Sequence, residues 1–273
     1  MKEIDNITDI HSILFESLCY FDDFCRDHGI NYFLANGTLL GAVKYNGFVP
    51  WDDDVDILLT RADYDKLMHL TEINNDRYRL LCREQVPEWR MPYAKLSRED
   101  TLIKEGEYNF GVEFGLAMDI FPIDKWSPYL WIAKIQAFRC EFLKRLLVCS
   151  IGDTFTTERK GLKRLILISI YHMGKILGHK RILHKILRST EKSKKRKKKY
   201  MGCLSWTCHL HKEVLPASCF ENTEYLTFCG RQFPVFSDYE MYLDSLYGAW
   251  REDLPKENQH SNHIIKVWHK NAE

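Results

Sequence analysis

Four carboxylates stand within five residues near the start of the chain, in the segment DDDVD at 52–56. The apolar run that follows them is typical of a buried strand. Side chains alternate between the two faces of a strand, so Asp52, Asp54 and Asp56 are expected to share one face. Like charges at that spacing repel one another, and a divalent cation relieves the repulsion. Oxygen ligands on a rigid strand suit Mg²⁺ or Mn²⁺, so the segment predicts a metal site that also receives phosphate.

Two other interpretations of the acidic segment fit less well. A solvated acidic turn needs no metal, but these acids directly precede a buried run and follow a glycine-containing turn. A calcium-binding EF-hand loop needs Gly at its sixth position and Glu at its twelfth. Counted from Asp52, those positions hold Ile57 and Asp63. We therefore expect a magnesium-type site rather than a calcium loop.

A glycine turn, Asn36-Gly37-Thr38, precedes Asp54 by 16 residues. It follows a strand expected at 32–35 and leads into an expected helix. Such a turn lets a phosphate approach free backbone N–H groups, although Gly-Thr at a helix start is also an ordinary cap. A strand, a glycine turn, a helix and then an Asp-x-Asp strand is the layout of nucleotidyltransferases.

That layout normally takes a third carboxylate from a neighbouring strand. Asp119 is the best candidate, because it stands between apolar residues in a strand expected at 116–120. Asp124 follows Pro122 and is expected in a loop or at a helix cap, outside the catalytic set.

The segments at 36–43 and 47–56 closely resemble LicD proteins, the bacterial phosphocholine transferases related to fukutin-type enzymes. Three further segments look similar, at 61–67, 118–124 and 242–250. The resemblance covers about residues 20–125 well and 230–263 loosely. Lys44 departs from it, because arginine is common at that position.

The resemblance implies an enzyme that moves phosphocholine, or a related phospho-alcohol, from a CDP-linked donor to a sugar hydroxyl. The acceptor would be a cell-surface glycan or its lipid-linked precursor, CMP would leave, and Mg²⁺ or Mn²⁺ would neutralise the phosphates. The implied catalytic residues are Asp54, Asp56 and Asp119, with Asp52 as a further metal ligand. The turn residues Asn36, Gly37 and Thr38 would cradle phosphate.

Four more side chains are weaker substrate-binding candidates. Lys44, Lys95 and Arg98 suit phosphate or sugar, although surface positions explain most such residues. Trp51 could stack on a base or on choline, or be a core aromatic beside a proline.

A cluster of zinc-ligand types follows later, at Cys203, Cys208, His209 and His211. Its spacing fits a structural zinc site only loosely, because the adjacent Cys208 and His209 would point in opposite directions on a strand. An active-site role for His260 and His263 has no support from spacing.

The surrounding pattern predicts an α+β fold, with a nucleotidyltransferase-like mixed sheet flanked by helices and a helical insertion. We expect a catalytic core at 1–125, a helical basic region at 126–200 and a C-terminal part at 201–273 that completes the domain. Further strands are expected at 78–82 and 93–96, long helices at 129–149 and 158–188, a hairpin at 225–236 around Gly230-Arg231, and a helix at 238–246.

The composition of the 273 residues, 45% of them hydrophobic, excludes a disordered chain. The sequence shows no secretory signal, and nine cysteines without a C-x-x-C pair favour a cytoplasmic location. The net charge of +1 conceals a division, because residues 159–199 hold 16 Lys and Arg against one acid. This basic helical segment is expected either to bind the inner face of an anionic membrane or to pack on the rest of the chain, which is acidic.

The alternative to an enzyme is a non-catalytic binding protein that uses residues 159–199 to bind anionic lipid or nucleic acid. An intact set of acids argues against a degenerate site. No nucleic-acid partner is expected, because the basic segment lacks interleaved aromatic residues.

Overall fold

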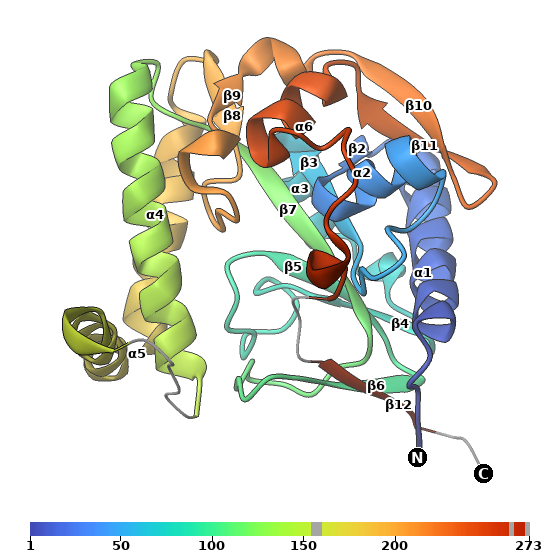
Figure 1. The fold of residues 1–273 in the computed structure, drawn as a ribbon, viewed down its shortest axis with the longest axis horizontal. Coiled ribbons are helices and arrows are strands. Elements are labelled where there is room, and N and C mark those ends of the chain that lie inside the picture. Colours follow the sequence, from blue (N-terminus) through green and yellow to red (C-terminus); the bar gives the residue numbers. More distant parts are fainter. Residues whose placement is uncertain (154–159, 262–264, 271–273) are drawn as a thin grey trace.

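The structure is a computed structural model that describes residues 1–153, 160–261 and 265–270. Its centre is a mixed β-sheet with helices packed around it (Figure 1), which confirms the expected α+β fold. The main strands follow the spatial order β2-β3-β7-β5-β4. Their bounds are β2 (Tyr32–Leu34), β3 (Asp56–Thr60), β7 (Ala117–Lys125), β5 (Ala94–Arg98) and β4 (Tyr78–Leu81).

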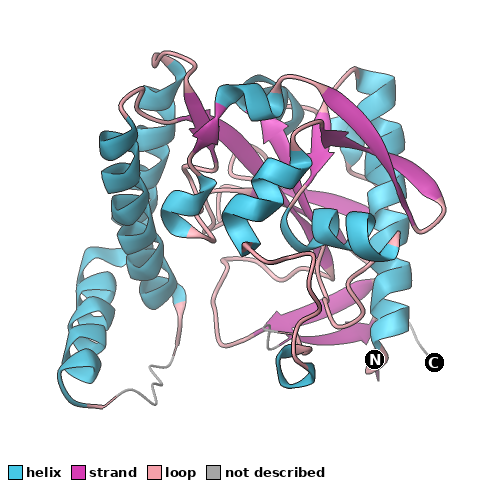
Figure 2. Cartoon of the chain, turned by 45° about the horizontal axis from the view of Figure 1, so that its top comes forward, coloured by secondary structure: helices cyan, strands magenta, loops and turns pink. Residues whose placement is uncertain are grey.

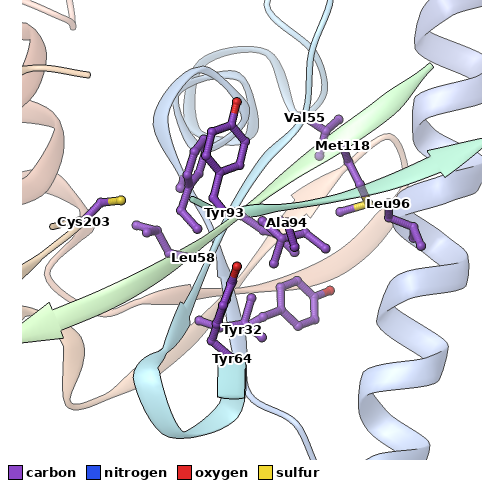
Figure 3. Packing of buried hydrophobic residues seen from close by; sticks show 14 of the residues in the cluster. Tyr32, Val55, Leu58, Tyr64, Tyr93, Ala94, Leu96, Met118 and Cys203 are labelled. Carbon is purple, nitrogen blue, oxygen red and sulfur yellow. The ribbon is translucent and has the colours of Figure 1, made fainter. Parts of the chain in front are cut away.

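Two central strands run parallel, and their register decides where the site forms. β3 pairs with β7 so that Asp56 stands beside Asp119, whereas the other neighbours in this order are antiparallel. Successive residues of β7 point to opposite faces, so Met118 enters the hydrophobic core on the face away from Asp119. Figure 3 shows Met118 beside Leu96 of β5 and Val55 in this core.

Helices cover the main sheet and fix its ends. Helix α1 begins where the Asn6 side chain accepts a backbone N–H of the first turn, and it ends at Gly29, whose φ of 57° is left-handed. Leu14, Leu18 and Phe21 recur at helical spacing and are fully buried. The bounds of the shorter elements are α1 (Ile7–His28), α2 (Asn36–Tyr45), α3 (Arg61–Met68), α6 (Tyr239–Tyr247), and the 3₁₀ turns η1 (Thr71–Ile73), η2 (Leu210–Glu213), η3 (Ala217–Phe220) and η4 (Lys256–Asn258).

Smaller β-structures surround the main sheet. Strands β1 (Lys2–Glu3), β12 (Ile265–His269) and β6 (Thr101–Glu105) form a three-stranded sheet that the sequence pattern does not predict. Strands β8 (Tyr200–Gly202) and β9 (Leu215–Pro216) extend the main sheet from the end of β7.

The hairpin expected near residue 230 is present as β10 (Thr223–Phe228) and β11 (Arg231–Phe236). Its turn is Cys229-Gly230, one residue earlier than expected. Both turn residues have positive φ, as a two-residue hairpin loop requires.

Two long helices lie side by side at one edge of the molecule (Figures 1 and 2). They are α4 (Leu130–Ile151) and α5 (Gly161–Lys194), which confirms the helices expected there. α5 breaks at Gly178, whose φ of 72° and ψ of 150° are not helical. It continues to Lys194, into the expected charge run. Within the described residues, every helix is too short or too polar to cross a membrane.

Asp124 corrects one expectation from the sequence. It lies within β7 rather than in a loop or cap, because the strand continues through Pro122 to Lys125. Its two carboxylate oxygens each accept a hydrogen bond of 2.9 Å from Arg61, and Ser193 of α5 donates a third. Asp124 is fully buried and joins α3, β7 and α5.

Replacing Asp124 with Asn leaves the guanidinium of Arg61 without its bidentate partner. We expect the free energy of unfolding to fall by about 3–5 kcal/mol, the usual cost of removing one partner of a buried ion pair. Urea denaturation measures the change. Asp65→Asn is the matched control, because Asp65 is an exposed second partner of Arg61 and should cost less than about 1 kcal/mol. Equal stability of the two variants would contradict this role for Asp124.

Candidate active site

The carboxylates expected to act together do meet in one cavity. Asp56 and Asp119 are neighbours on β3 and β7, and the backbone N–H of Asp119 donates to the Val55 carbonyl over 2.8 Å. Residues 52–55 are not part of the strand, yet Asp52 and Asp54 line the same cavity as Asp56 and Asp119.

Asp53 takes no part in this grouping. Its side chain is buried and accepts a hydrogen bond of 2.8 Å from Ser261. As expected from the alternation, Asp52, Asp54 and Asp56 line the cavity and Asp53 does not.

The turn before α2 holds Asp56 in place. The Asp56 backbone N–H donates to Thr38 Oγ1 over 2.9 Å, and Asn36 Nδ2 donates to Asp56 Oδ2 over 3.0 Å. Tyr242 of α6 donates to Asn36 Oδ1, which fixes the orientation of that amide. Asn36 has a positive φ of 45°, a conformation that Asn tolerates better than most residues. The turn thus positions a carboxylate through side chains from distant parts of the sequence.

Gly37 allows a close approach that another residue would block. A Cβ atom at this position would lie 2.1 Å from Asp52 Oδ2. Real Cβ contacts are never so short, so glycine lets the acidic segment lie directly against the start of α2.

Burial and mutual repulsion raise the pKa of two of these acids. Burial raises the pKa of Asp56 well above its usual range, and the charges of Asp54 and Asp119 raise it further. Burial raises the pKa of Asp119 to about 6, although Lys95, whose Nζ lies 2.7 Å from Asp119 Oδ1, opposes the shift. The site therefore carries an excess of negative charge that one lysine does not neutralise.

The donor set fits a hard divalent cation that shares its coordination with a substrate. In the described part of the chain, no three His, Cys, Asp or Glu side chains form a group ready to hold a metal by themselves. Magnesium usually binds one or two protein carboxylates together with substrate phosphate and water, so a full protein cage is not required. Asp56 and Asp119, with Asp54 beside them, would be the ligands.

The cavity has a volume of about 670 Å³, and seven aromatic side chains contribute to its walls. Lys44 lies at its rim, where Nζ donates to the Glu252 carbonyl and pairs with Asp253. Trp51 lines it and meets the Tyr45 ring edge-on. The aromatic side chains lining the cavity are Tyr45, Trp51, Tyr93, Phe121, Trp206, Tyr247 and Trp250.

Residues 29–144 match the nucleotidyltransferase domain described as LicD/FKTN/FKRP, and this span contains Asp54, Asp56 and Asp119. The chain carries a LicD-family nucleotidyltransferase domain. The resemblance stated from the motifs is confirmed.

Known proteins are similar to this chain to different extents. It is 28% identical to the lipopolysaccharide cholinephosphotransferase LicD of Haemophilus influenzae over 259 residues, which are 92% of this chain and 93% of the relative. A shorter match, 44% identical over 46 residues, links it to the uncharacterized protein RP689 of Rickettsia prowazekii and covers 17% of this chain and 16% of the relative.

Three of the expected substrate contacts lie in other surroundings in the structure. Lys95 is buried and pairs with Asp119 and Glu105 rather than facing open space. Arg98 lies outside the cavity, where it pairs with Glu16 and Asp100 and stacks on the Tyr78 ring. Thr38 is buried beneath the site and supports Asp56. Each is held by partners that a sequence pattern does not identify.

The residues considered for zinc lie in different surroundings. Cys203 is buried beside Ser205, whereas Cys208 and His209 line the cavity and His211 stacks on Phe138 of α4. Burial lowers the pKa of His209 to about 4. His260 also lines the cavity, and His263 lies outside the described residues.

Several residues of the candidate site are missed by the sequence argument. Glu105, Trp206, Tyr242, Tyr247 and Trp250 all reach the cavity or its supporting bonds from segments far from the motifs. Three of them, Tyr242, Tyr247 and Trp250, lie in segment 242–250, and its similarity to the family is the only sequence signal for them.

Replacing Asp56 with Asn should stabilise the metal-free protein, because it removes one of the mutually repelling carboxylates. A carboxylate whose pKa is raised by folding contributes stability at low pH that is lost as pH rises through the folded-state pKa. We expect a higher Tm than that of the parent at about pH 8 and no gain at about pH 4. Thermal melts with a chelator measure it. Asp53→Asn is the control and should show no gain. A lower Tm of Asp56→Asn at the higher pH would contradict the repulsion.

Proposed function

We propose that the protein transfers phosphocholine from a CDP-linked donor to a sugar hydroxyl of a cell-surface glycan or its lipid-linked precursor, and releases CMP. The observation that carries the proposal is the in-register placement of Asp56 and Asp119, with Asp54, in a cavity with aromatic walls. The similarity to a lipopolysaccharide cholinephosphotransferase along nearly the whole chain supports the transferred group and the acceptor class.

In this proposal the acceptor oxygen forms a new bond to the phosphorus that carries choline, and the bond from that phosphorus to CMP breaks. A bound Mg²⁺ would neutralise the diphosphate and the departing CMP. Asp119 would take the proton of the acceptor hydroxyl, since a pKa of about 6 leaves its carboxylate ionised at neutral pH. Lys95 holds that carboxylate in position, and Asn36 and Thr38 hold Asp56.

The aromatic walls suit a quaternary ammonium group. A choline head group has a positive charge and no hydrogen-bond donor, so it is held by aromatic faces and nearby carboxylates. Trp51 and Tyr45 lie beside the acidic segment, so a choline group could meet both kinds of contact there.

Activity should require the cavity acids and not their neighbour. Incubation with CDP-choline, Mg²⁺ and lipopolysaccharide that lacks phosphocholine should release CMP. Asp54→Asn and Asp119→Asn should each lower the rate by about 100-fold or more, because each removes a charge that acts on the reacting phosphates. Asp53→Asn, which lies outside the cavity, should stay close to the parent rate. No CMP release by the parent, or near-parent rates of the cavity variants, would contradict the proposal.

Replacing Trp51 with Leu should weaken recognition of a charged head group. We expect the Kd for CDP-choline to rise by about 2- to 30-fold, the equivalent of about 0.5–2 kcal/mol for a cation–π contact. Calorimetry with CDP-choline and with CDP-glycerol separates the effects, because glycerol carries no positive charge. An equal loss for both nucleotides would show that Trp51 stacks on the base or shapes the cavity.

A further inference from the structure

The outer face of α4 carries an apolar stripe that contacts no other part of the described chain closely enough to be buried. Trp131, Ile135, Phe138 and Phe142 recur at intervals of four, three and four residues, so they lie along one line of the helix. All four are exposed, Trp131 by 67%. The opposite face of the same helix is buried through Ala133, Ala137 and Cys140.

The first half of α5 likewise has an exposed apolar face and a face that packs on the protein. Leu162, Leu165, Ile166, Met173 and Ile176 form an exposed apolar stripe, Ile176 being 79% exposed. Another face packs on the end of α4 at Gly174, where an added Cβ would lie 2.7 Å from the Leu146 carbonyl oxygen. After the break at Gly178 the helix turns inward, and its apolar residues there are buried in the core.

The two halves of α5 fit different interpretations of the basic segment. The second half of α5 packs on the body. Lys194 at its end pairs with Asp65, and Lys198, beyond the helix, pairs with Glu221. The first half of α5 and the outer face of α4 have no such cover. Together these exposed apolar residues of α4 and α5 are called the helical face below.

Cations surround the helical face, and acids are scarce there. Exposed Lys134, Arg139 and Arg145 flank the stripe of α4, whose only acidic residue is Glu141. In α5 the only acidic residue is Glu191, in the half that packs on the body.

A cation-lined cavity of about 730 Å³ adjoins the end of the α5 stripe, directly after Gly178. Glu88 is the one acidic side chain lining it. Its basic and titratable lining residues are Arg83, Arg90, His179, Lys180 and His184.

We propose that the helical face lies on an anionic phospholipid bilayer, with its apolar side chains among the upper acyl chains and its cations against the phosphates. A soluble protein partner would explain exposed apolar stripes, but the excess of Lys and Arg on both sides of the stripes favours a surface of negative charge. Aromatic and aliphatic side chains flanked by Lys and Arg are the composition of helices that bind in the plane of a membrane. The positive charge of the helical face and of the adjoining cavity favours a surface of lipid phosphates as the binding partner.

Helix α4, which carries part of the helical face, also contacts a loop that lines the candidate active site. Lys144 of α4 donates to the Thr207 carbonyl and lies 5.6 Å from the centre of the Trp206 ring, which lines the catalytic cavity. Phe138, on the stripe itself, stacks on His211 of the same loop region. Binding of α4 to a bilayer would therefore hold the cavity next to the membrane surface. The inference does not depend on the proposed transferase activity, because lipid binding is measured without turnover.

Flotation of the full chain with vesicles tests the proposal. The parent should float with vesicles of phosphatidylglycerol mixed with phosphatidylcholine, and not with phosphatidylcholine alone. Binding should weaken at high salt, because screening reduces the attraction to anionic lipid. The double variant Trp131→Ser/Phe142→Ser should lose at least about tenfold in partitioning, because both side chains are exposed on the stripe. Circular dichroism and thermal melts verify that each variant is folded.

A charge-matched pair of variants separates this face from the rest of the surface. Lys134→Gln/Arg139→Gln should lower partitioning by about thirtyfold, from ~1 kcal/mol for each basic residue near an anionic surface. Lys2→Gln/Lys266→Gln removes the same charge from exposed positions on the small sheet, away from α4 (Figure 1), and should bind as the parent does. Failure of the parent to float with phosphatidylglycerol, or equal binding by both charge variants, would overturn the proposal. The proposal would also be overturned if the parent formed a dimer and Trp131→Ser/Phe142→Ser dissociated that dimer without changing flotation.

Discussion

Repulsion between carboxylates that the central sheet places side by side is the constraint on which the site depends. Parallel pairing of β3 and β7 brings Asp56 next to Asp119 in a partly buried position. Such a pair is unfavourable by itself, because burial and like charge both oppose ionisation. The fold keeps it through Lys95 on one acid and Asn36 on the other, and a divalent cation with a diphosphate would complete the neutralisation.

Residues far from these carboxylates in the sequence help to position them. Tyr242 of α6 orients Asn36, so the C-terminal segment takes part in positioning a strand near the N-terminus. Glycine at 37 lets the acidic segment approach α2. The Arg61–Asp124 ion pair ties α3 to β7 on the face away from the cavity. A substitution at Tyr242 would therefore act on Asp56 through Asn36.

The acids that line the cavity could be predicted from the sequence, although only Asp56 lies on the expected strand and residues 52–55 precede it. The prediction failed at Asp124, because Pro122 suggested the end of a strand. In the structure Pro122 lies between the ends of β5 and β8, where β7 has no antiparallel neighbour, so the missing N–H interrupts no pairing there. Lys95 and Arg98 could not be assigned either, because their ion-pair partners come from other elements. Of the aromatic side chains that line the cavity, Tyr45, Phe121 and Tyr247 belong to two helices and a strand, and the others come from loops without periodicity.

Anomalous diffraction from crystals grown with Mn²⁺ and CMP tests the central claim most directly. The account predicts a manganese peak between Asp56 and Asp119, about 2.0–2.3 Å from a carboxylate oxygen of each and bonded to the phosphate of CMP. Crystals with CMP bound and no manganese at this pair, or with manganese held instead by Cys208 and His209, would contradict it.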